Sequence, residues 1–307
     1  MIREQVVVGA GTKYPLKGIL TLPENAAAPV PAVVFVHGSG SSNMDEKVMK
    51  MTPFKDIAEG LAKKGIASIR YDKRSFAHGF KMIREKNITV YEETIEDAIA
   101  ATSLLRKDKR IDSNQVYIIG HSMGAMLAPR IDYEGGNYAG LILMAGTPNT
   151  LVEVLFRQLE EMLHIQKGLA KFALQKQYDK YKNIFSRMYE MNIEESKKIK
   201  MGGGTTLYYF KEMAEKPAKQ YLDNCTKPIL ILQGSHDFQV SIEADYNAYI
   251  ELLKNKKDVT FKLYEGLNHT FTKALYSDIT KAKKEYDRDV RVEDVVIEDI
   301  ANWIRKN

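Results

Sequence analysis

The sequence predicts an α/β protein with a mostly parallel, eight-stranded sheet, helices on both faces of that sheet and a helical insertion. Short apolar or alternating segments, typical of strands, alternate with segments of helical period along most of the 307 residues. This alternation stops after Thr150 and resumes at Lys227, and the segment between them holds no strand-like apolar run. We therefore expect a core of residues 1–150 and 227–307 and a helical cap of residues 151–226.

Eight segments have the pattern of strands. The first two alternate around a turn that contains glycine and proline, as in an antiparallel pair, whereas later ones are continuous apolar runs such as Ala32–Val36. Continuous runs are expected of strands that are buried on both faces. The expected strands span residues 5–8, 16–22, 32–36, 66–72, 115–120, 139–146, 227–234 and 259–264. The expected helices span residues 53–64, 89–105, 242–253 and 292–305, and one more begins near residue 125.

Composition excludes several classes of function. The net charge is +5, and lysines interleave with acidic residues along most of the chain, so no basic stripe indicates a nucleic-acid partner. Cys225 is the only cysteine, which excludes a disulfide within the chain and fits a reducing compartment. No apolar run approaches the length of a membrane span, and the first residues lack the apolar core of a signal peptide. We expect a cytoplasmic protein without a membrane partner.

Known cofactor and metal motifs are not matched. Gly9–Gly11 meets Pro15 rather than a helix, so it is no dinucleotide-binding fingerprint. Gly202–Gly204 lacks the following Gly-Lys-Ser/Thr of a phosphate loop, and the sequence contains no HExxH motif or Cys/His cluster. The expected cofactor and metal content is therefore none.

The stretch Gly120-His121-Ser122-Met123-Gly124 lies between an expected buried strand and the start of a helix. This is the context of a nucleophile elbow, in which a strained turn presents the serine and needs neighbours without side chains. The serine hydroxyl would stand at the carboxyl edge of the sheet, near a helix N-terminus that favours developing negative charge. We therefore take Ser122 as the candidate nucleophile.

A nucleophilic serine needs a base, and the base needs an acid that orients it. Among six histidines we assign the base to His269 in "LNHTF", because it follows the last expected strand and precedes the last helix. We assign the acid to Asp237 in "GSHDF", in the turn after the preceding strand. The alternatives are that Asp237 only caps the next helix and that His269 is a surface loop residue. The other histidines are His37, His78, His121, His164 and His236.

Two further groups of residues are expected near this serine. A tetrahedral intermediate needs two backbone donors, which we assign to Met123, directly after the nucleophile, and to Ser39 in the "HGSG" loop, with Gly40 as the alternative. These glycines could instead only form a turn. Asp72 and Arg74, in "RYDKR", are expected to brace the neighbouring loops by an ion pair rather than to contact substrate. The stretch "SFAHGF" that follows is expected to be a loop.

These residues resemble the α/β-hydrolase superfamily, in which the triad follows the chain order Ser, Asp, His. The resemblance covers nearly the whole chain outside the expected cap, through "VHGSG", "RYDKR", "GHSMG", "GSHD" and "LNH". The stretches "PFKDIAEGLAKKGIASIRYDKR" and "GHSMGAMLAPRI" are most similar to bacterial cinnamoyl and feruloyl esterases and to acyl-peptidase-like hydrolases.

The resemblance implies a serine carboxylic ester hydrolase without a cofactor. It implies a small-molecule ester substrate, and an aromatic cap favours short-chain or aryl acyl esters, with hydroxycinnamoyl-type esters as the leading case. The alternatives are a serine peptidase or amidase of the same fold and a homologue that binds a ligand without catalysis. The order Ser122, Asp237, His269 favours an enzyme over the last alternative.

Overall fold

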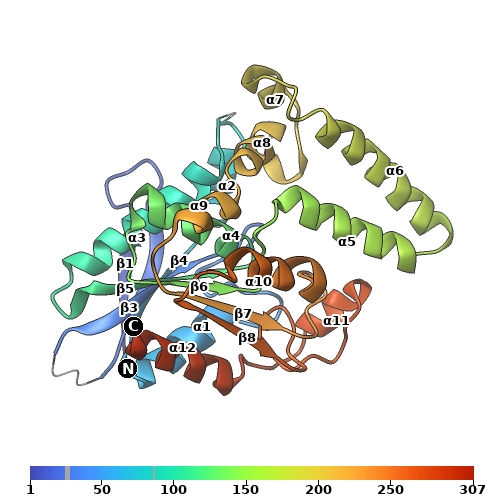
Figure 1. Ribbon diagram of the computed structural model, residues 1–307. Coiled ribbons are helices and arrows are strands. Elements are labelled where there is room, and N and C mark those ends of the chain that lie inside the picture. Colours follow the sequence, from blue (N-terminus) through green and yellow to red (C-terminus); the bar gives the residue numbers. More distant parts are fainter. Residues whose placement is uncertain (25–27, 86) are drawn as a thin grey trace.

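The computed structural model describes residues 1–24, 28–85 and 87–307, and within them it forms an eight-stranded sheet with helices on both faces (Figure 1). The strand order is β1-β2-β4-β3-β5-β6-β7-β8. β2 pairs antiparallel with β1 and with β4, and all other neighbours pair in parallel. The strands span Ile2–Val8 (β1), Leu16–Leu22 (β2), Val30–Val36 (β3), Ala67–Tyr71 (β4), Ile111–His121 (β5), Leu141–Met144 (β6), Ile229–Gly234 (β7) and Val259–Tyr264 (β8). The expected fold class is confirmed.

Helices connect these strands and also form the long insertion after β6. The α-helices span Pro53–Lys63 (α1), Arg74–Met82 (α2), Glu96–Lys107 (α3), Met123–Ile131 (α4), Leu151–Ile165 (α5), Gly168–Ser186 (α6), Ile193–Lys198 (α7), Leu207–Glu215 (α8), Ala218–Asn224 (α9), Asn247–Leu253 (α10), Ala282–Tyr286 (α11) and Asp294–Lys306 (α12). Short π-helical turns precede α3 at Tyr91–Ile95 and α10 at Ile242–Tyr246, and one follows α4 at Asp132–Gly136.

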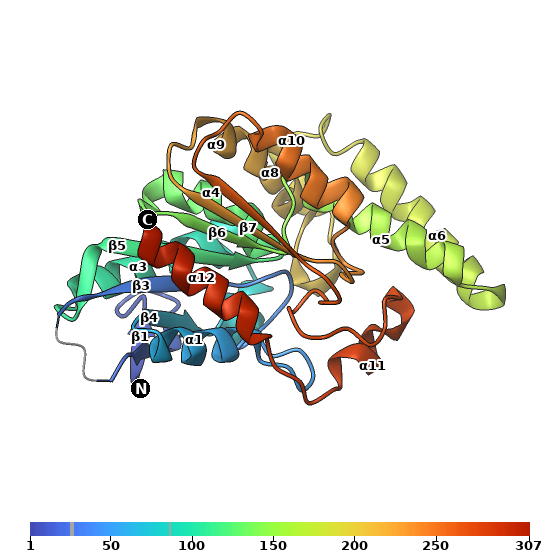
Figure 2. The same cartoon turned by 60° about the horizontal axis from the view of Figure 1, so that its bottom comes forward.

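The two faces of the sheet are covered by different helices. Successive side chains of a strand point to opposite faces. Val33 and Phe35 accordingly belong to a cluster that includes buried residues of α1 and α12, whereas Val34 and Val36 belong to one that includes buried residues of α3, α4 and α10. Figure 2 shows α1 and α12 together in front of the sheet and α4 and α10 behind it. This double cover explains why β3 is an unbroken apolar run.

Helix α1 begins and ends where the sequence carries the expected signals. Pro53 occupies the first turn of α1, where its missing N–H costs no hydrogen bond. Phe54, Ile57 and Leu61 of α1 are buried, which follows from their helical spacing. Gly65, just after the helix, has a φ of 84°, a conformation that glycine adopts readily.

Residues 151–226, which were expected to form a cap, hold the helices α5 to α9 between β6 and β7 and consist of two differently packed parts. α5 starts at a capping box between Thr150 and Glu153, and α5 and α6 extend away from the sheet (Figure 1). Phe185 of α6 and Met188 belong to a separate apolar cluster, to which α8 also contributes Leu207 and Ala214. In contrast, Tyr209 of α8 and Leu222 of α9 join the main core next to α4. The later part of the insertion is therefore packed as core rather than as a detached lobe.

One expectation about local structure is wrong. The stretch expected to be a loop, "SFAHGF", lies inside α2, with a local irregularity at His78, whose φ is −132°. A glycine at position 79 weakens the helical pattern in the sequence.

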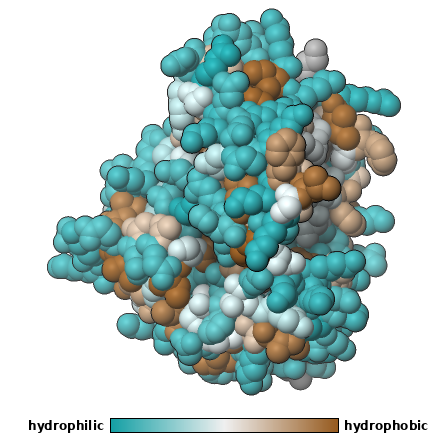
Figure 3. All heavy atoms as spheres, turned by 90° about the vertical axis from the view of Figure 1, so that its right-hand side faces the viewer, coloured by the Kyte–Doolittle hydropathy of each residue, from teal (hydrophilic) through white to brown (hydrophobic). Residues whose placement is uncertain are grey.

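Seen from the side of α5 and α6, the surface carries separate apolar groups among hydrophilic ones (Figure 3).

Candidate active site

Ser122 lies in the turn between β5 and α4, and its backbone has a φ of +54° and a ψ of −119°. A positive φ is strained for a residue with a side chain. A Cβ atom on Gly120 would lie 2.3 Å from the carbonyl oxygen of Gly124, and a Cβ atom on Gly124 would lie 2.1 Å from the carbonyl oxygen of Val36. Both positions therefore require glycine, and the tight turn holds Ser122 at the carboxyl end of β5.

His269 and Asp237 are brought together from the loops that follow β8 and β7. Nδ1 of His269 lies 2.7 Å from Oδ2 of Asp237, and both side chains are buried. Oδ1 of Asp237 accepts hydrogen bonds from the backbone N–H groups of Gln239, at 2.7 Å, and Val240, at 3.0 Å. Because these bonds fix the carboxylate, its second oxygen is directed at the imidazole. The pair thus has the geometry of an acid that orients a base.

The loop that carries His269 is held by the preceding residue. The side-chain oxygen of Asn268 accepts hydrogen bonds from the N–H groups of Thr270, at 3.0 Å, and Thr272, at 3.1 Å. Its side-chain nitrogen donates to Oε1 of the fully buried Glu285, at 2.7 Å. These contacts restrict the loop without involving the imidazole, which remains available for a second partner.

His121 connects the turn of Ser122 to the loop of His269. Nε2 of His121 donates a hydrogen bond to the backbone carbonyl of His269, with a distance of 2.9 Å, and the two ring centroids are 4.7 Å apart. Among the described residues, no hydrogen bond joins the Ser122 hydroxyl directly to His269. Such bonds between a nucleophile and its base are commonly long in the absence of substrate.

The expected oxyanion donors lie beside Ser122, in the wall of one cavity. Ser39, Ser122 and Met123 line one small cavity of about 50 Å³. The N–H of Met123 is at the first position of α4, where a helix leaves its amides without an acceptor in the helix. Within the described part of the chain no acceptor is found for this amide. Gly38 is not a candidate donor, because its N–H already donates to Oε1 of Glu46, at 2.6 Å.

Three buried polar side chains form contacts near the loop of Gly38 and Ser39 that were not predicted from the sequence. Nζ of Lys73 donates to the carbonyl oxygen of Gly38, at 2.8 Å, and lies 3.8 Å from Oε1 of Glu93. The hydroxyl of Tyr209 donates to Oε2 of Glu93, at 2.5 Å. Burial lowers the pKa of Lys73 and raises that of Tyr209 well above its usual value. The only signal for Lys73 was its place between Asp72 and Arg74 in "RYDKR".

Asp72 and Arg74 do not pair with each other. Arg74 forms ion pairs with Asp97 and with Glu96, and thus joins the start of α2 to α3. Oδ1 of Asp72 accepts a hydrogen bond from the N–H of Met44, at 2.9 Å, in the loop after β3. Both side chains contact loops or helices near the site, but each has its own partner. The expected mutual ion pair is wrong, since Arg74 points to α3.

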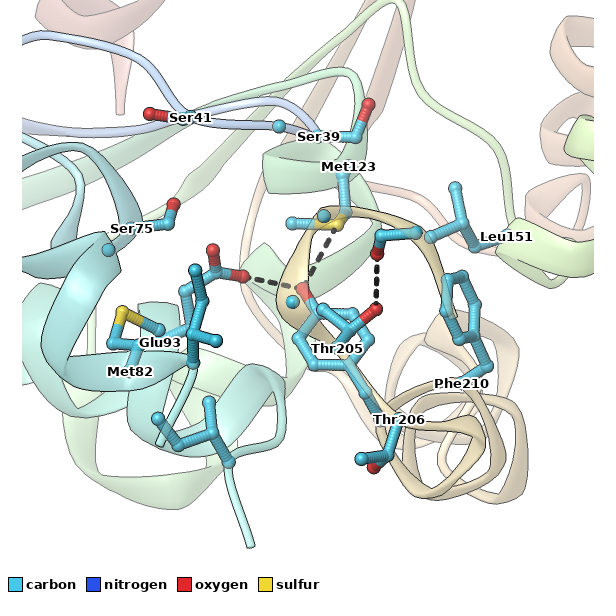
Figure 4. A pocket seen from close by; sticks show the side chains of 18 of the residues that line it. Ser39, Ser41, Ser75, Met82, Glu93, Met123, Leu151, Thr205, Thr206 and Phe210 are labelled. Atoms are coloured by element: carbon cyan, nitrogen blue, oxygen red, sulfur yellow. Dashed lines mark hydrogen bonds between the residues drawn. The ribbon is translucent and has the colours of Figure 1, made fainter. Parts of the chain in front are cut away.

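A cavity of about 420 Å³, here called the main cavity, opens beside the loop after β3 that contains Ser39 (Figure 4). Its walls include Ser39 and Met123 from the core and Leu151, Tyr209 and Phe210 from the insertion. A second, apolar cavity of about 290 Å³ lies between α5, α6 and α8 and shares Phe210 with the main cavity. Residues 151–226 therefore contribute to the space beside Met123, and Leu151 and Leu155 also line the small cavity that contains Ser122.

Other sequence expectations concern cofactors and membranes. Within the described ranges, no group of three or more His, Cys, Asp or Glu side chains has the geometry of a metal site. No helix of the described residues is long and apolar enough to cross a membrane. Cys225 is partly buried, and burial raises the pKa of its thiol, which disfavours the reactive thiolate.

Comparison with known proteins identifies the family. The family model described as serine aminopeptidase, S33, matches residues 27–273. Esterase EstD from Thermotoga maritima is 33% identical over 291 residues, which cover 95% of this chain. The chain spans 66% of the length of that relative.

Solved structures support the same fold. The ferulic acid complex of Est1E from Butyrivibrio proteoclasticus matches with a TM-score of 0.59 and 17% identity, covering 98% of each chain. Proline iminopeptidase from Mycobacterium smegmatis matches with a TM-score of 0.61 and 14% identity, covering 99% of this chain and 98% of that one. Together with the family match and the 33% identical relative, this fold confirms the expected membership in the α/β-hydrolase superfamily. Within that superfamily, the chain belongs to the serine aminopeptidase S33 family of hydrolases.

Proposed function

We propose that the protein is a serine carboxylic ester hydrolase that uses Ser122, His269 and Asp237. The observation that carries the proposal is the 2.7 Å contact between His269 Nδ1 and Asp237 Oδ2, next to a serine in a strained turn at the same edge of the sheet. The relationship to a protein named as an esterase, at 33% identity, supports an ester rather than another acyl substrate.

The proposed reaction proceeds in two acyl-transfer steps. Ser122 Oγ attacks the ester carbonyl while Nε2 of His269 takes the hydroxyl proton, and the N–H groups of Met123 and Ser39 bind the oxyanion. Asp237 keeps the His269 proton on Nδ1 and stabilises the imidazolium. His269 then protonates the leaving alcohol. In the second step His269 takes a proton from water, which attacks the acyl-enzyme, and His269 then returns the proton to Ser122 Oγ as the acid is released.

The preferred substrates are proposed to be esters of short-chain or aryl acids, with hydroxycinnamoyl-type esters as the leading specific case. The main cavity, of about 420 Å³, suits a compact acyl group. Tyr209 and Phe210 give it aromatic walls on which a flat ring can pack. In this role residues 151–226 act as a cap over the site.

A cytoplasmic location is also proposed, because the sequence has a single cysteine, Cys225, which fits a reducing compartment.

Hydrolysis of p-nitrophenyl esters tests the proposed activity. We expect the wild-type protein to release p-nitrophenol and Ser122→Ala to lose this activity. If the purified wild-type protein hydrolyses no ester of any acyl length, the enzyme proposal fails, and a ligand-binding role is favoured.

A panel of acetyl, butyryl, decanoyl and hydroxycinnamoyl esters tests the acyl preference. A preference for decanoyl above about tenfold, or roughly 1.4 kcal/mol in the transition state, would contradict the compact-acyl proposal.

Amide hydrolysis is the second candidate, because the matching family is described as serine aminopeptidase. An ester and an amide of the same acid form the same acyl-enzyme and share its hydrolysis, but they differ in the leaving group of the acylation step, which for an amine must be protonated before it departs. Aminoacyl p-nitroanilides and the corresponding esters should therefore be compared on the same preparation. Values of kcat/KM that are higher for the anilide than for the ester would favour the aminopeptidase.

A further inference from the structure

The loop that follows β3 is held by buried charged side chains rather than by its own backbone. Gly38, in this loop, packs directly against the nucleophile, since a Cβ atom on Gly38 would lie only 3.1 Å from Cβ of Ser122. The N–H and the carbonyl group of Gly38 are each bound by a different buried side chain. A loop at this distance from Ser122 determines which backbone groups face the reacting carbonyl.

Glu46 binds the N–H side of Gly38. Its Oε1 accepts the hydrogen bond from Gly38, at 2.6 Å, and its Oε2 lies 2.9 Å from Nδ1 of His121. The second contact is not aligned as a hydrogen bond, so it is an ion pair. Glu46 itself is 5% exposed and has a φ of 50°, a strained backbone that its buried contacts must stabilise. The carboxylate thus joins the loop after β3 to the turn after β5.

His121 is the counter-ion of this carboxylate. Its Nε2 faces the carbonyl oxygen of His269 and its Nδ1 faces the carboxylate of Glu46, and both of these partners accept hydrogens. These two acceptors favour the form of the imidazole that carries a proton on both ring nitrogens. Burial alone would lower the pKa of His121, but the charge of Glu46 and these contacts raise it above its usual value. In contrast, burial lowers the pKa of the nearby His37 to about 4.

Lys73 binds the opposite side of the same residue. Its Nζ, 2% exposed, donates to the carbonyl oxygen of Gly38, at 2.8 Å. The carbonyl of Gly38 and the N–H of Ser39 belong to one planar trans peptide and point in opposite directions. When Lys73 holds the carbonyl, it therefore also fixes the direction of the Ser39 N–H. Ser39 and Ser122 line the same small cavity.

We propose that Lys73 and Glu46 are positioning residues that hold Gly38 from its two sides and so direct the Ser39 N–H toward the oxyanion. This inference rests on the proposed function for its catalytic consequence. Neither side chain touches substrate. Their effect is confined to the transition state, where negative charge develops on the carbonyl oxygen, so their loss should lower kcat and leave KM nearly unchanged.

Replacement of the lysine provides the main test. Lys73→Met should lower kcat for p-nitrophenyl butyrate by about ten- to a hundredfold, since complete loss of one oxyanion donor costs about 10²–10³-fold. Binding of an aryl trifluoromethyl ketone, which forms a tetrahedral oxyanion on Ser122, should weaken by the same factor. Lys211→Met is the matched control, because Lys211 is also buried and donates to a backbone carbonyl, that of Met188 at 3.3 Å, away from Ser122.

The carboxylate is tested by two variants of different severity. Glu46→Gln keeps an oxygen that can accept from the Gly38 N–H, whereas Glu46→Ala removes it. We expect Glu46→Ala to lower kcat at least tenfold more than Glu46→Gln, with a similar KM for both. Equal effects of the two variants, or a wild-type kcat in a folded Lys73→Met protein, would overturn the proposal. If Lys211→Met lowered kcat as much as Lys73→Met does, the proposal would also be overturned.

A crystal structure of Lys73→Met separates this inference from the proposed function. We expect the Gly38–Ser39 peptide to be rotated or to occupy more than one orientation. An unchanged peptide would refute the positioning role whatever the activity. If the wild-type protein hydrolyses no ester, the proposed function fails, and the orientation of this peptide still decides whether Lys73 holds it.

Discussion

Replacement of Asp237 by asparagine should leave the fold intact and reduce turnover by forcing the wrong tautomer of His269. Oδ1 of Asp237 accepts from the N–H groups of Gln239 and Val240, at 2.7 and 3.0 Å. In Asp237→Asn the amide oxygen must take this position, because an NH2 group there would face two donors. The NH2 group is then directed at Nδ1 of His269, which must become an acceptor and carry its proton on Nε2.

A His269 with its proton on Nε2 cannot accept the proton of Ser122. The same change in tautomer lowers kcat by about 10⁴-fold in a well-studied serine protease, and we expect a loss of up to that size here. Gln233 adds to the effect, since its Nε2 donates to Oδ2 of Asp237, at 3.1 Å, and would meet a second donor in the variant. His269→Ala should be at least as damaging as Asp237→Asn.

The assay is the steady-state hydrolysis of p-nitrophenyl butyrate, together with the thermal unfolding of each variant. Asp132→Asn is a matched control, because Asp132 also accepts a backbone hydrogen bond, from Tyr138 N–H at 2.6 Å, but lies after α4 and away from the candidate triad. A folded Asp237→Asn protein whose kcat stays within tenfold of the wild-type value would refute the reasoning, and another carboxylate would have to orient His269.

Three further predictions concern stability. Because Ser122 has a positive φ, Ser122→Gly should be more stable than Ser122→Ala by about 1 kcal/mol in chemical denaturation, and equal stabilities would mean that the turn is unstrained. Gly124→Ala should unfold at a much lower temperature than the wild-type protein, since its Cβ would lie 2.1 Å from the carbonyl oxygen of Val36, whereas Gly202→Ala, with open space around the new Cβ, should change stability by less than about 0.5 kcal/mol. Protonation of His37 should contribute a loss of about 3 kcal/mol of unfolding free energy between pH 6.5 and 4, because the unfolded chain protonates His37 near pH 6.5 while burial holds its folded pKa at about 4. His37→Gln should lose less over this range, and an identical pH profile would contradict the lowered pKa.

Much of the fold was predictable because its signals are local. Each expected strand corresponds to an observed one, and the span of β8, Val259–Tyr264, was expected residue for residue. Ser122, Asp237 and His269 could be singled out because each follows an apolar run, and the carboxyl ends of parallel strands share one edge. Each of these three residues follows a different strand in the sequence, and the fold brings all three to one edge of the sheet.

The supporting contacts could not be predicted, since they depend on pairs of residues far apart in the chain. Nothing in the local pattern around Glu46 indicates that its carboxylate reaches Gly38 and His121. Likewise, the sequence "RYDKR" favoured a pair between neighbours, whereas Arg74 contacts α3 and Lys73 contacts the loop after β3. Helical period alone also did not separate the part of the insertion that packs into the core from the part that extends outward.

The most direct test of the proposed mechanism is covalent labelling with a p-nitrophenyl alkylphosphonate. Attack by Ser122 Oγ on phosphorus would form a stable bond to the serine and expel p-nitrophenolate, with the hydroxyl proton taken by His269. Intact-protein and peptide mass spectrometry would then locate the adduct. We expect one adduct per chain, on the peptide that contains Ser122, with one equivalent of p-nitrophenol released and no adduct in Ser122→Ala. No adduct on the wild-type protein, or an adduct that persists in Ser122→Ala, would contradict the assignment of Ser122 as the nucleophile.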